Sequence, residues 1–460
     1  MSKKNIVVFL ELLIYAIIAI IMSYSLSNKL LGGVLFGVSL IILIFATWYK
    51  IRENYGLSAN ILFPTWLSIF QNIYLGLFST ELGSLEIQIL TIINFIYACI
   101  IFILLFVMYG KVVTNGEVWK QKIFYLTIIL TLYSFMTAFM YRVNLIALFA
   151  SFRNIISVFL FLLIGILAAG KSNKNYIFNI ILILGTIVII FGFLDIQSKG
   201  ELWRQLNITE LWTKKGITLQ PSGLPTNFFS SETINGERIR RMASTFADPV
   251  NLGSFLVVIF CIAWIKNKKT ILVLTIIAMI LTVSKSALLG ALVFITVYAY
   301  YNFTRIYFCL TALMATLCSL GYLTYAYITS SNSVFLHISG FLAAFKGLTS
   351  KPLGSGMGSA GILARQFVQS HNEEITESGI GMIIGQLGIV GLAIYSCIFV
   401  ILYKRIITIR CKKNKVMVLS LFFSILLNIC FNEVALSPNT CAIYFLIIGL
   451  YIGEKVEYSL

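Results

Sequence analysis

The 2 histidines of the chain, His337 and His371, fall in one polar stretch that runs from residue 330 to residue 378. Histidine is the side chain whose ordinary pKa allows it to exchange protons near neutral pH. The same stretch contains the acidic residues Glu374 and Glu377. A histidine beside a carboxylate can act as a general base, so this stretch predicts proton-transfer chemistry. The alternative interpretation is a solvated loop without a chemical task.

A second concentration of charge consists of Arg238, Arg240 and Arg241. These arginines lie shortly before a predicted helix that begins near Asn251. Guanidinium groups bind phosphate oxygens in pairs, and the start of a helix adds partial positive charge. The pattern therefore favours an anion-binding site, and the alternative is a basic cluster that contacts lipid headgroups.

Two further cations, Arg153 and Lys285, lie within or between apolar runs. A lysine at the centre of a bilayer costs about 2.5–3.5 kcal/mol on insertion scales. Such a side chain therefore either extends to the membrane surface or faces a polar cavity, and extension to the surface is the commoner case. Glu11, in the first apolar run, is expected to make a near-surface or interhelical contact.

Glycines follow the first histidine between Gly354 and Gly361. Such a run can turn backbone N–H groups toward an anion, although this one lacks the P-loop pattern, and a plain turn is the alternative. Small residues recur in the next apolar run, where they predict close helix packing: Gly381, Gly385, Gly388 and Gly391. The 8 cysteines lie in or beside apolar runs, so neither disulfides nor a zinc site is expected.

The elements that must position these residues are membrane helices. The chain is 59% hydrophobic and 11% charged, whereas a soluble domain carries about 25% charged residues. With roughly 20 apolar residues needed for each crossing, the sequence predicts about fourteen spans. Their predicted centres are Ile17, Ile41, Ser68, Asn94, Thr131, Phe161, Gly185, Val258, Ile277, Phe294, Leu313, Val390, Ser424 and Leu446.

The placement of positive charge predicts the orientation. With both termini in the cytoplasm, lysine and arginine gather in the short inner segments, and the short outer segments contain only Lys29, Arg142 and Lys285. The net charge of +17 therefore indicates membrane topology rather than nucleic-acid binding. The predicted divisions are helices in 1–196, a long outer loop in 197–250, helices in 251–329, a second long outer loop in 330–378, and helices in 379–460.

The order of these motifs resembles the O-antigen polymerase and O-antigen ligase superfamily. Residues 241–253 resemble its Arg-x-x-Ser-Thr-Phe-x-x-Pro-Asn-x-x-Gly stretch. Residues 281–287 resemble its Leu-Thr-x-Ser-Arg-x-Ala motif, with Lys285 where arginine is usual. Residues 337–361 resemble the polymerases' His-hydrophobic-x-Gly and Pro-Leu-Gly-x-Gly-x-Gly, and residues 377–391 resemble their Glu-Ser and Gly-x-x-Gly helix start.

The resemblance implies an all-α, polytopic fold similar to that of class C glycosyltransferases. It also implies inverting, metal-independent glycosyl transfer at the outer face of a bacterial cytoplasmic membrane. The donor would be a glycan on undecaprenyl diphosphate, and the acceptor another lipid-linked glycan. Membrane lipids, a chain-length regulator and a flippase are the further partners expected, and no cofactor, metal or nucleic acid is expected.

The resemblance also assigns roles to residues. Arg241 would stabilise the diphosphate leaving group, with Arg240, Arg238 and Lys285 in support. His337 is the first candidate for the base that deprotonates the acceptor hydroxyl, and Glu377 is the second. The weaker candidates, which lie outside the matched motifs, are His371, Arg153 and Glu374.

Two other functions remain open from the sequence. A ligase of the same superfamily would move one finished glycan to a different acceptor. A lipid-linked glycan flippase or other transporter belongs to a different class, and it predicts repeated halves and short outer loops. The long outer segments and their arginine and histidine content favour the polymerase.

Overall fold

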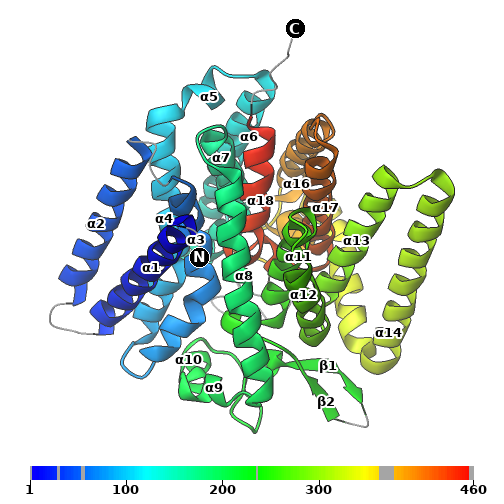
Figure 1. Ribbon diagram of the computed structural model, residues 1–460, viewed down its shortest axis with the longest axis horizontal. Coiled ribbons are helices and arrows are strands. Elements are labelled where there is room, and N and C mark those ends of the chain that lie inside the picture. Colours follow the sequence, from blue (N-terminus) through cyan, green and yellow to red (C-terminus); the bar gives the residue numbers. More distant parts are fainter. Residues whose placement is uncertain (1–2, 28–31, 53–56, 235–236, 362–377, 455–460) are drawn as a thin grey trace.

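The computed structural model describes residues 3–27, 32–52, 57–234, 237–361 and 378–454. Figure 1 shows a bundle of long helices with a small two-stranded sheet at one end. The prediction of a helical membrane protein is confirmed, because long apolar helices make up most of the described chain.

The first half of the chain forms the helices α1 (Lys3–Ser27), α2 (Gly32–Arg52), α3 (Leu57–Leu77), α4 (Ser84–Tyr109), α5 (Lys111–Thr114), α6 (Val118–Met140), α7 (Leu145–Ala168) and α8 (Lys174–Gln197). Arg153 does not interrupt α7, which is one continuous helix. The predicted interhelical role of Glu11 is confirmed: its carboxylate accepts a hydrogen bond of 2.6 Å from the Tyr176 hydroxyl and lies 3.6 Å from Lys50 Nζ.

The second half of the chain forms the helices α11 (Pro249–Ile265), α12 (Lys269–Thr282), α13 (Lys285–Asn302), α14 (Arg305–Ser350), α16 (Gly379–Ile406), α17 (Lys412–Phe431) and α18 (Pro438–Ile452), with a 3-10 turn η3 (Glu433–Leu436) before α18. Each predicted span centre falls within one of the long helices. In the described part of the chain, 6 helices are long and apolar enough to cross a membrane. The total number of crossings remains a prediction.

The centre of the bundle is built on α7 and α18, which lies in the middle of Figure 1 in red. Gly165 of α7 and Gly449 of α18 face each other, so a methyl group on Gly165 would meet the Leu446 carbonyl oxygen at 2.5 Å. Two helix backbones approach this closely only where small residues meet. This contact fixes α7, and with it Arg153, against the C-terminal helix.

The predicted first loop is an ordered unit between α8 and α11. It contains α9 (Glu201–Gln205), α10 (Ile208–Lys214), η1 (Thr226–Phe228), the antiparallel strands β1 (Phe229–Ile234) and β2 (Glu237–Arg240), and η2 (Ser244–Phe246). Trp203 and Phe228 are fully buried within it. We call the end of the bundle that carries this unit the loop end, and the opposite end, which carries α5, the basic end (Figure 1).

The second predicted loop differs from expectation at its start. Helix α14 runs for 46 residues and continues through residue 330 to Ser350, so the first part of the predicted loop is helical. The helix ends at Ser350 because the next residue, Lys351, precedes Pro352, and a residue before a proline is disfavoured in helical conformation. Helix α14 packs against α13 and α16 and also approaches β1, which brings the two predicted loop regions together.

Candidate functional site

Two of the four sequence motifs meet at the loop end. The backbone N–H of Met242 donates to the Leu281 carbonyl at 2.9 Å, and Arg241 Nε donates to the Thr282 carbonyl at the same distance. One helical turn into α11, a methyl group on Gly253 would meet Ser284 Oγ at 2.6 Å. Segments 241–253 and 281–287 are therefore one structural unit, although residues 254–280 separate them in the chain.

The start of α11 explains why the first of these motifs has its sequence. Asp248 is the N-cap, and its carboxylate accepts hydrogen bonds from the backbone N–H groups of Val250 and Asn251 at 3.2 and 3.4 Å. Pro249 follows at the first helical position, where its missing N–H costs nothing. Burial raises the pKa of the Asp248 carboxyl, against the backbone hydrogen bonds and the charge of Arg241, which lower it. Asp248 is therefore a helix cap.

Arg241 and Lys285 lie on either side of the junction between α12 and α13. Arg241 is anchored to Thr282, and Lys285 is the first residue of α13. A cation at a helix N-terminus opposes the partial positive charge of the helix, so this position does not favour lysine for stability. Both charges together with the helix start are suited to hold a bound anion.

Arg240 lies in different surroundings from Arg241 and Lys285. Its Nη2 forms an ion pair of 2.7 Å with Asp195, which is fully buried in the last turn of α8. Its Nη1 donates to the carbonyls of Phe228 and Arg241 at 3.2 and 2.6 Å. Arg240 is committed to this ion pair, because a buried carboxylate must keep its cationic partner. The role of these cations in diphosphate binding stays a prediction. Burial lowers the pKa of Arg240, and Asp195 opposes this shift. Arg238, in contrast, is exposed on β2.

The glycine-rich run packs against α16. The backbone N–H groups of Ser355 and Gly356 donate to the carbonyls of Gly385 and Gln386 at 2.8 and 3.0 Å. These carbonyls are open because α16 breaks at Gly388, where φ is +59°. Gly385 and Gly388, two of the glycines predicted to pack helix on helix, therefore contact the glycine-rich run, and the amides of Ser355 and Gly356 are used internally rather than for an anion.

Sequence reasoning missed Glu433, the first residue of η3. It is 2% exposed, and a methyl group on Gly361 would meet its Oε2 at 2.7 Å. Glu433 thus lies at the end of the glycine-rich run, at the loop end of α17 and α18. The signal that could have found it is an isolated acidic residue between two apolar runs.

Sequence reasoning also missed Lys215, which follows α10. Its Nζ donates to Asn72 Oδ1 at 2.9 Å, and the charge of Arg153 in α7 lowers its pKa further than burial alone. Arg153 therefore lies near the first loop.

Of the histidine and glutamate residues predicted as bases, the structure describes the position of His337 alone. His337 lies in α14, the helix that approaches β1. His371, Glu374 and Glu377 lie outside the described residues. The pairing of a histidine with Arg241 therefore stays a prediction. In the described part of the chain, no three His, Cys, Asp or Glu side chains gather as a metal site would require.

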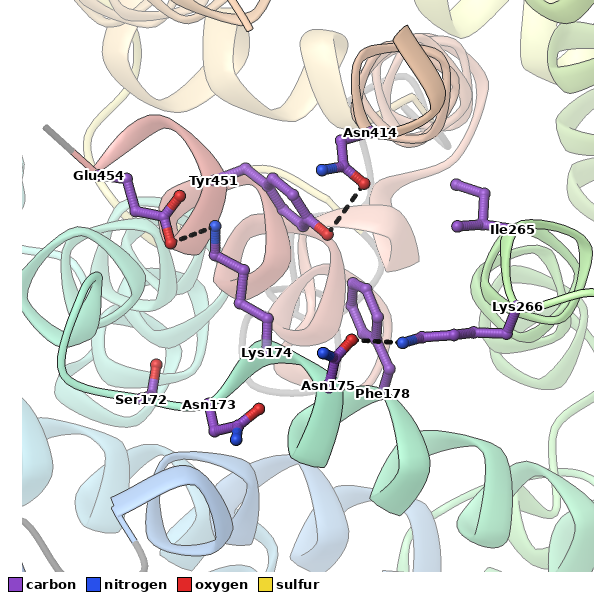
Figure 2. A pocket seen from close by; sticks show the side chains of 10 residues that line it. All are labelled: Ser172, Asn173, Lys174, Asn175, Phe178, Ile265, Lys266, Asn414, Tyr451 and Glu454. Atoms are coloured by element: carbon purple, nitrogen blue, oxygen red, sulfur yellow. Dashed lines mark hydrogen bonds and ion pairs between the residues drawn. The ribbon is translucent and has the colours of Figure 1, made fainter. Parts of the chain in front are cut away.

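A cavity of about 470 Å³ opens at the basic end (Figure 2). Lys174 pairs with Glu454 across it, and Lys266 donates to Asn175. These lysines come from the junctions between α7 and α8 and between α11 and α12, which the charge pattern predicts to be cytoplasmic. Their pairing and their distance from Arg241 along the bundle separate this cavity from the candidate site.

Comparison with known proteins adds no relative. No protein family matches the chain, and no curated protein is similar to it.

Proposed function

We propose that this protein is a membrane glycosyltransferase that polymerises polyprenyl-diphosphate-linked oligosaccharide repeat units at the outer face of a bacterial cytoplasmic membrane. The observation that carries the proposal is the hydrogen bonding that joins Arg241 and Met242 to Thr282 and Leu281. It unites the two cation-bearing motifs of the family resemblance in one place, at the end of the bundle that the charge pattern assigns to the outer face.

The proposed reaction needs a stabilised leaving group. The oxygen of an acceptor hydroxyl attacks the anomeric carbon of the donor, and the bond between that carbon and the diphosphate oxygen breaks. Negative charge develops on polyprenyl diphosphate, next to lipid, where fixed cations stabilise it more than they would in water. Arg241 and Lys285 hold this charge, with Arg238 in support. The hydroxyl proton passes to His337, or to Glu377 as the second candidate, and the anomeric configuration inverts.

The test is polymerisation in vitro from a defined lipid-linked repeat unit with the purified protein. Arg241→Gln should lower the rate about 10²–10³-fold, the cost of removing one preorganised donor to the developing charge. Lys285→Gln should also lower the rate, whereas Lys285→Arg should retain it, because arginine keeps the charge and adds a second donor. Lys199→Gln, which removes an exposed cation at the same end, is the matched control.

The products decide between functions. A ladder of lengthened lipid-linked glycans supports polymerisation, and one unchanged block on a different acceptor indicates a ligase. In cells, Arg241→Gln should leave repeat units on the outer face. Their accumulation on the cytoplasmic face instead would indicate a flippase and would overturn the proposal.

A further inference from the structure

Two cations, Arg153 and Lys215, lie on neighbouring residues of the α3–α4 contact at the loop end, apart from Arg241 and Lys285. The Thr91 carbonyl accepts from Arg153 and also from Gln71 Nε2 at 2.9 Å, and Asn72, the next residue of α3, accepts from Lys215. Arg153 extends from the third turn of α7. Among the described residues, its guanidinium has only long contacts with neutral oxygens, at 3.3 Å to Asn154 Oδ1 and 3.5 Å to the Thr91 carbonyl. Arg153 is half-buried, and a guanidinium withdrawn from water normally has a carboxylate partner.

Lys215 approaches Arg153 from the first loop. Its Nζ lies 4.7 Å from the centre of the Trp212 ring and donates to Asn72 Oδ1 at 2.9 Å. Burial lowers the pKa of Lys215 to about 7, and the charge of Arg153 lowers it too. The groups around Lys215 are the neutral Asn72 of α3, the Trp212 ring of α10 and Arg153 of α7.

The neighbouring cations of the first loop are paired with carboxylates. Arg204 lies 2.9 Å from Glu201, Lys214 lies 3.0 Å from Glu210, and Arg240 pairs with Asp195. Among the described residues, neither Arg153 nor Lys215 has such a partner within 4.0 Å.

A hydrogen-bond donor without an acceptor lies next to this pair. The indole of Trp212 is 4% exposed, and its Nε1 has no hydrogen-bond partner in the described part of the chain. A buried donor normally has an acceptor. One kind of ligand, an oxyanion, would therefore pair with Arg153 and Lys215 and accept a hydrogen bond from Trp212 Nε1.

The surroundings tie the pair to the candidate site. Asn72 accepts from Lys215 and donates to the carbonyl of Phe246, within segment 241–253. Arg153, from α7, is held by the close packing of that helix on α18. The pair therefore has a fixed position beside the motif that carries Arg241.

We infer that Arg153 and Lys215 form a second anion-binding site, distinct from Arg241 and Lys285, which takes an oxyanion of the substrate. Phosphate and carboxylate share the required chemistry. The phosphate source would be the diphosphate of the acceptor lipid, and the carboxylate source an acidic sugar of the repeat unit. The assignment of these sources rests on the proposed function, whereas the anion site itself does not.

The experiment measures anion binding to the full-length protein in detergent by titration calorimetry, with inorganic pyrophosphate and glucuronate as probes. Arg153→Gln and Lys215→Gln should each weaken binding about ten- to a hundredfold, the effect of losing a hydrogen bond to a charged group. Lys199→Gln is the control for a lost charge. Arg241→Gln should affect pyrophosphate binding only at the Arg241–Lys285 site, and the binding that Arg153→Gln and Lys215→Gln weaken should remain in it. Tighter binding of pyrophosphate indicates the lipid diphosphate, and tighter binding of glucuronate indicates an acidic sugar.

A second measurement uses sulfate, whose charge is constant over the pH range, as the probe. Sulfate should bind the wild-type protein more tightly at pH 6 than at pH 8.5, because Lys215 loses its proton between them. Lys215→Arg should bind sulfate at both pH values alike. If Arg153→Gln and Lys215→Gln bind the probes as the wild type does, or if the wild type binds none, the inference fails. Neither result depends on polymerisation, so failure of this inference would not overturn the proposed function, which the polymerisation assay tests.

Discussion

Arg240 and Arg153 are both arginines withdrawn from solvent at the loop end, and their surroundings differ in one respect. Arg240 has the buried carboxylate of Asp195 at 2.7 Å. Arg153 has neutral oxygens at 3.3–3.5 Å and a second cation, Lys215, nearby. A buried charge with its counter-charge in place is part of the structure. A buried charge that faces another of the same sign favours a ligand of opposite sign.

Loss of the counter-charge should have the largest effect on stability. Asp195→Ala leaves Arg240 buried without its carboxylate and should lower the free energy of unfolding by about 3–5 kcal/mol. The matched control is Glu201→Ala, which removes the exposed partner of Arg204 and should change stability by no more than about 1 kcal/mol. Chemical unfolding in detergent measures both. Equal effects of the two variants would remove the distinction between paired and unpaired arginines.

A substitution in the glycine-rich run should have the next largest effect on stability. Gly358 has φ of +93°, and a methyl group there would lie 2.7 Å from the backbone of Ala147. Gly358→Ala should therefore cost about 1–3 kcal/mol of stability. Gly347→Ala, in α14 where nothing lies within 4 Å, should be neutral or stabilise by about 0.5–1 kcal/mol. A loss of activity in Gly358→Ala at unchanged stability would instead assign the run to ligand binding.

A third effect is a dependence of stability on pH. The pKa of Lys215 is about 7 in the folded protein, below its ordinary value of 10.5. The unfolded chain then binds more protons between these values, so the free energy of unfolding should rise as pH increases from 7 toward 10. Unfolding experiments at several pH values should show this rise in the wild type and a reduced rise in Lys215→Gln. An identical pH profile in the two proteins would place Lys215 in solvent.

The sequence predicted the helices well because a membrane span needs a long apolar run, which is visible without a fold. The long outer loop that it predicted at 197–250 is an ordered unit in the structure, where Trp203 and Phe228 are fully buried. The start of the second predicted loop is helical in the structure, because polar residues near 330 do not break a helix and Pro352 does. Sequence reasoning missed Lys215 and Glu433, because their importance depends on what packs beside them.

The sequence by itself therefore determined which segments are apolar helices, where the charges fall along the chain and which motifs contain cations. Only the tertiary structure decided what each charge faces. Arg240 and Arg241 are adjacent in the chain, yet one pairs with Asp195 of α8 and the other is anchored to Thr282 of α12. The reason is physical: the energy of a charge depends on its distance to other charges and on its burial, and distant parts of the chain set both.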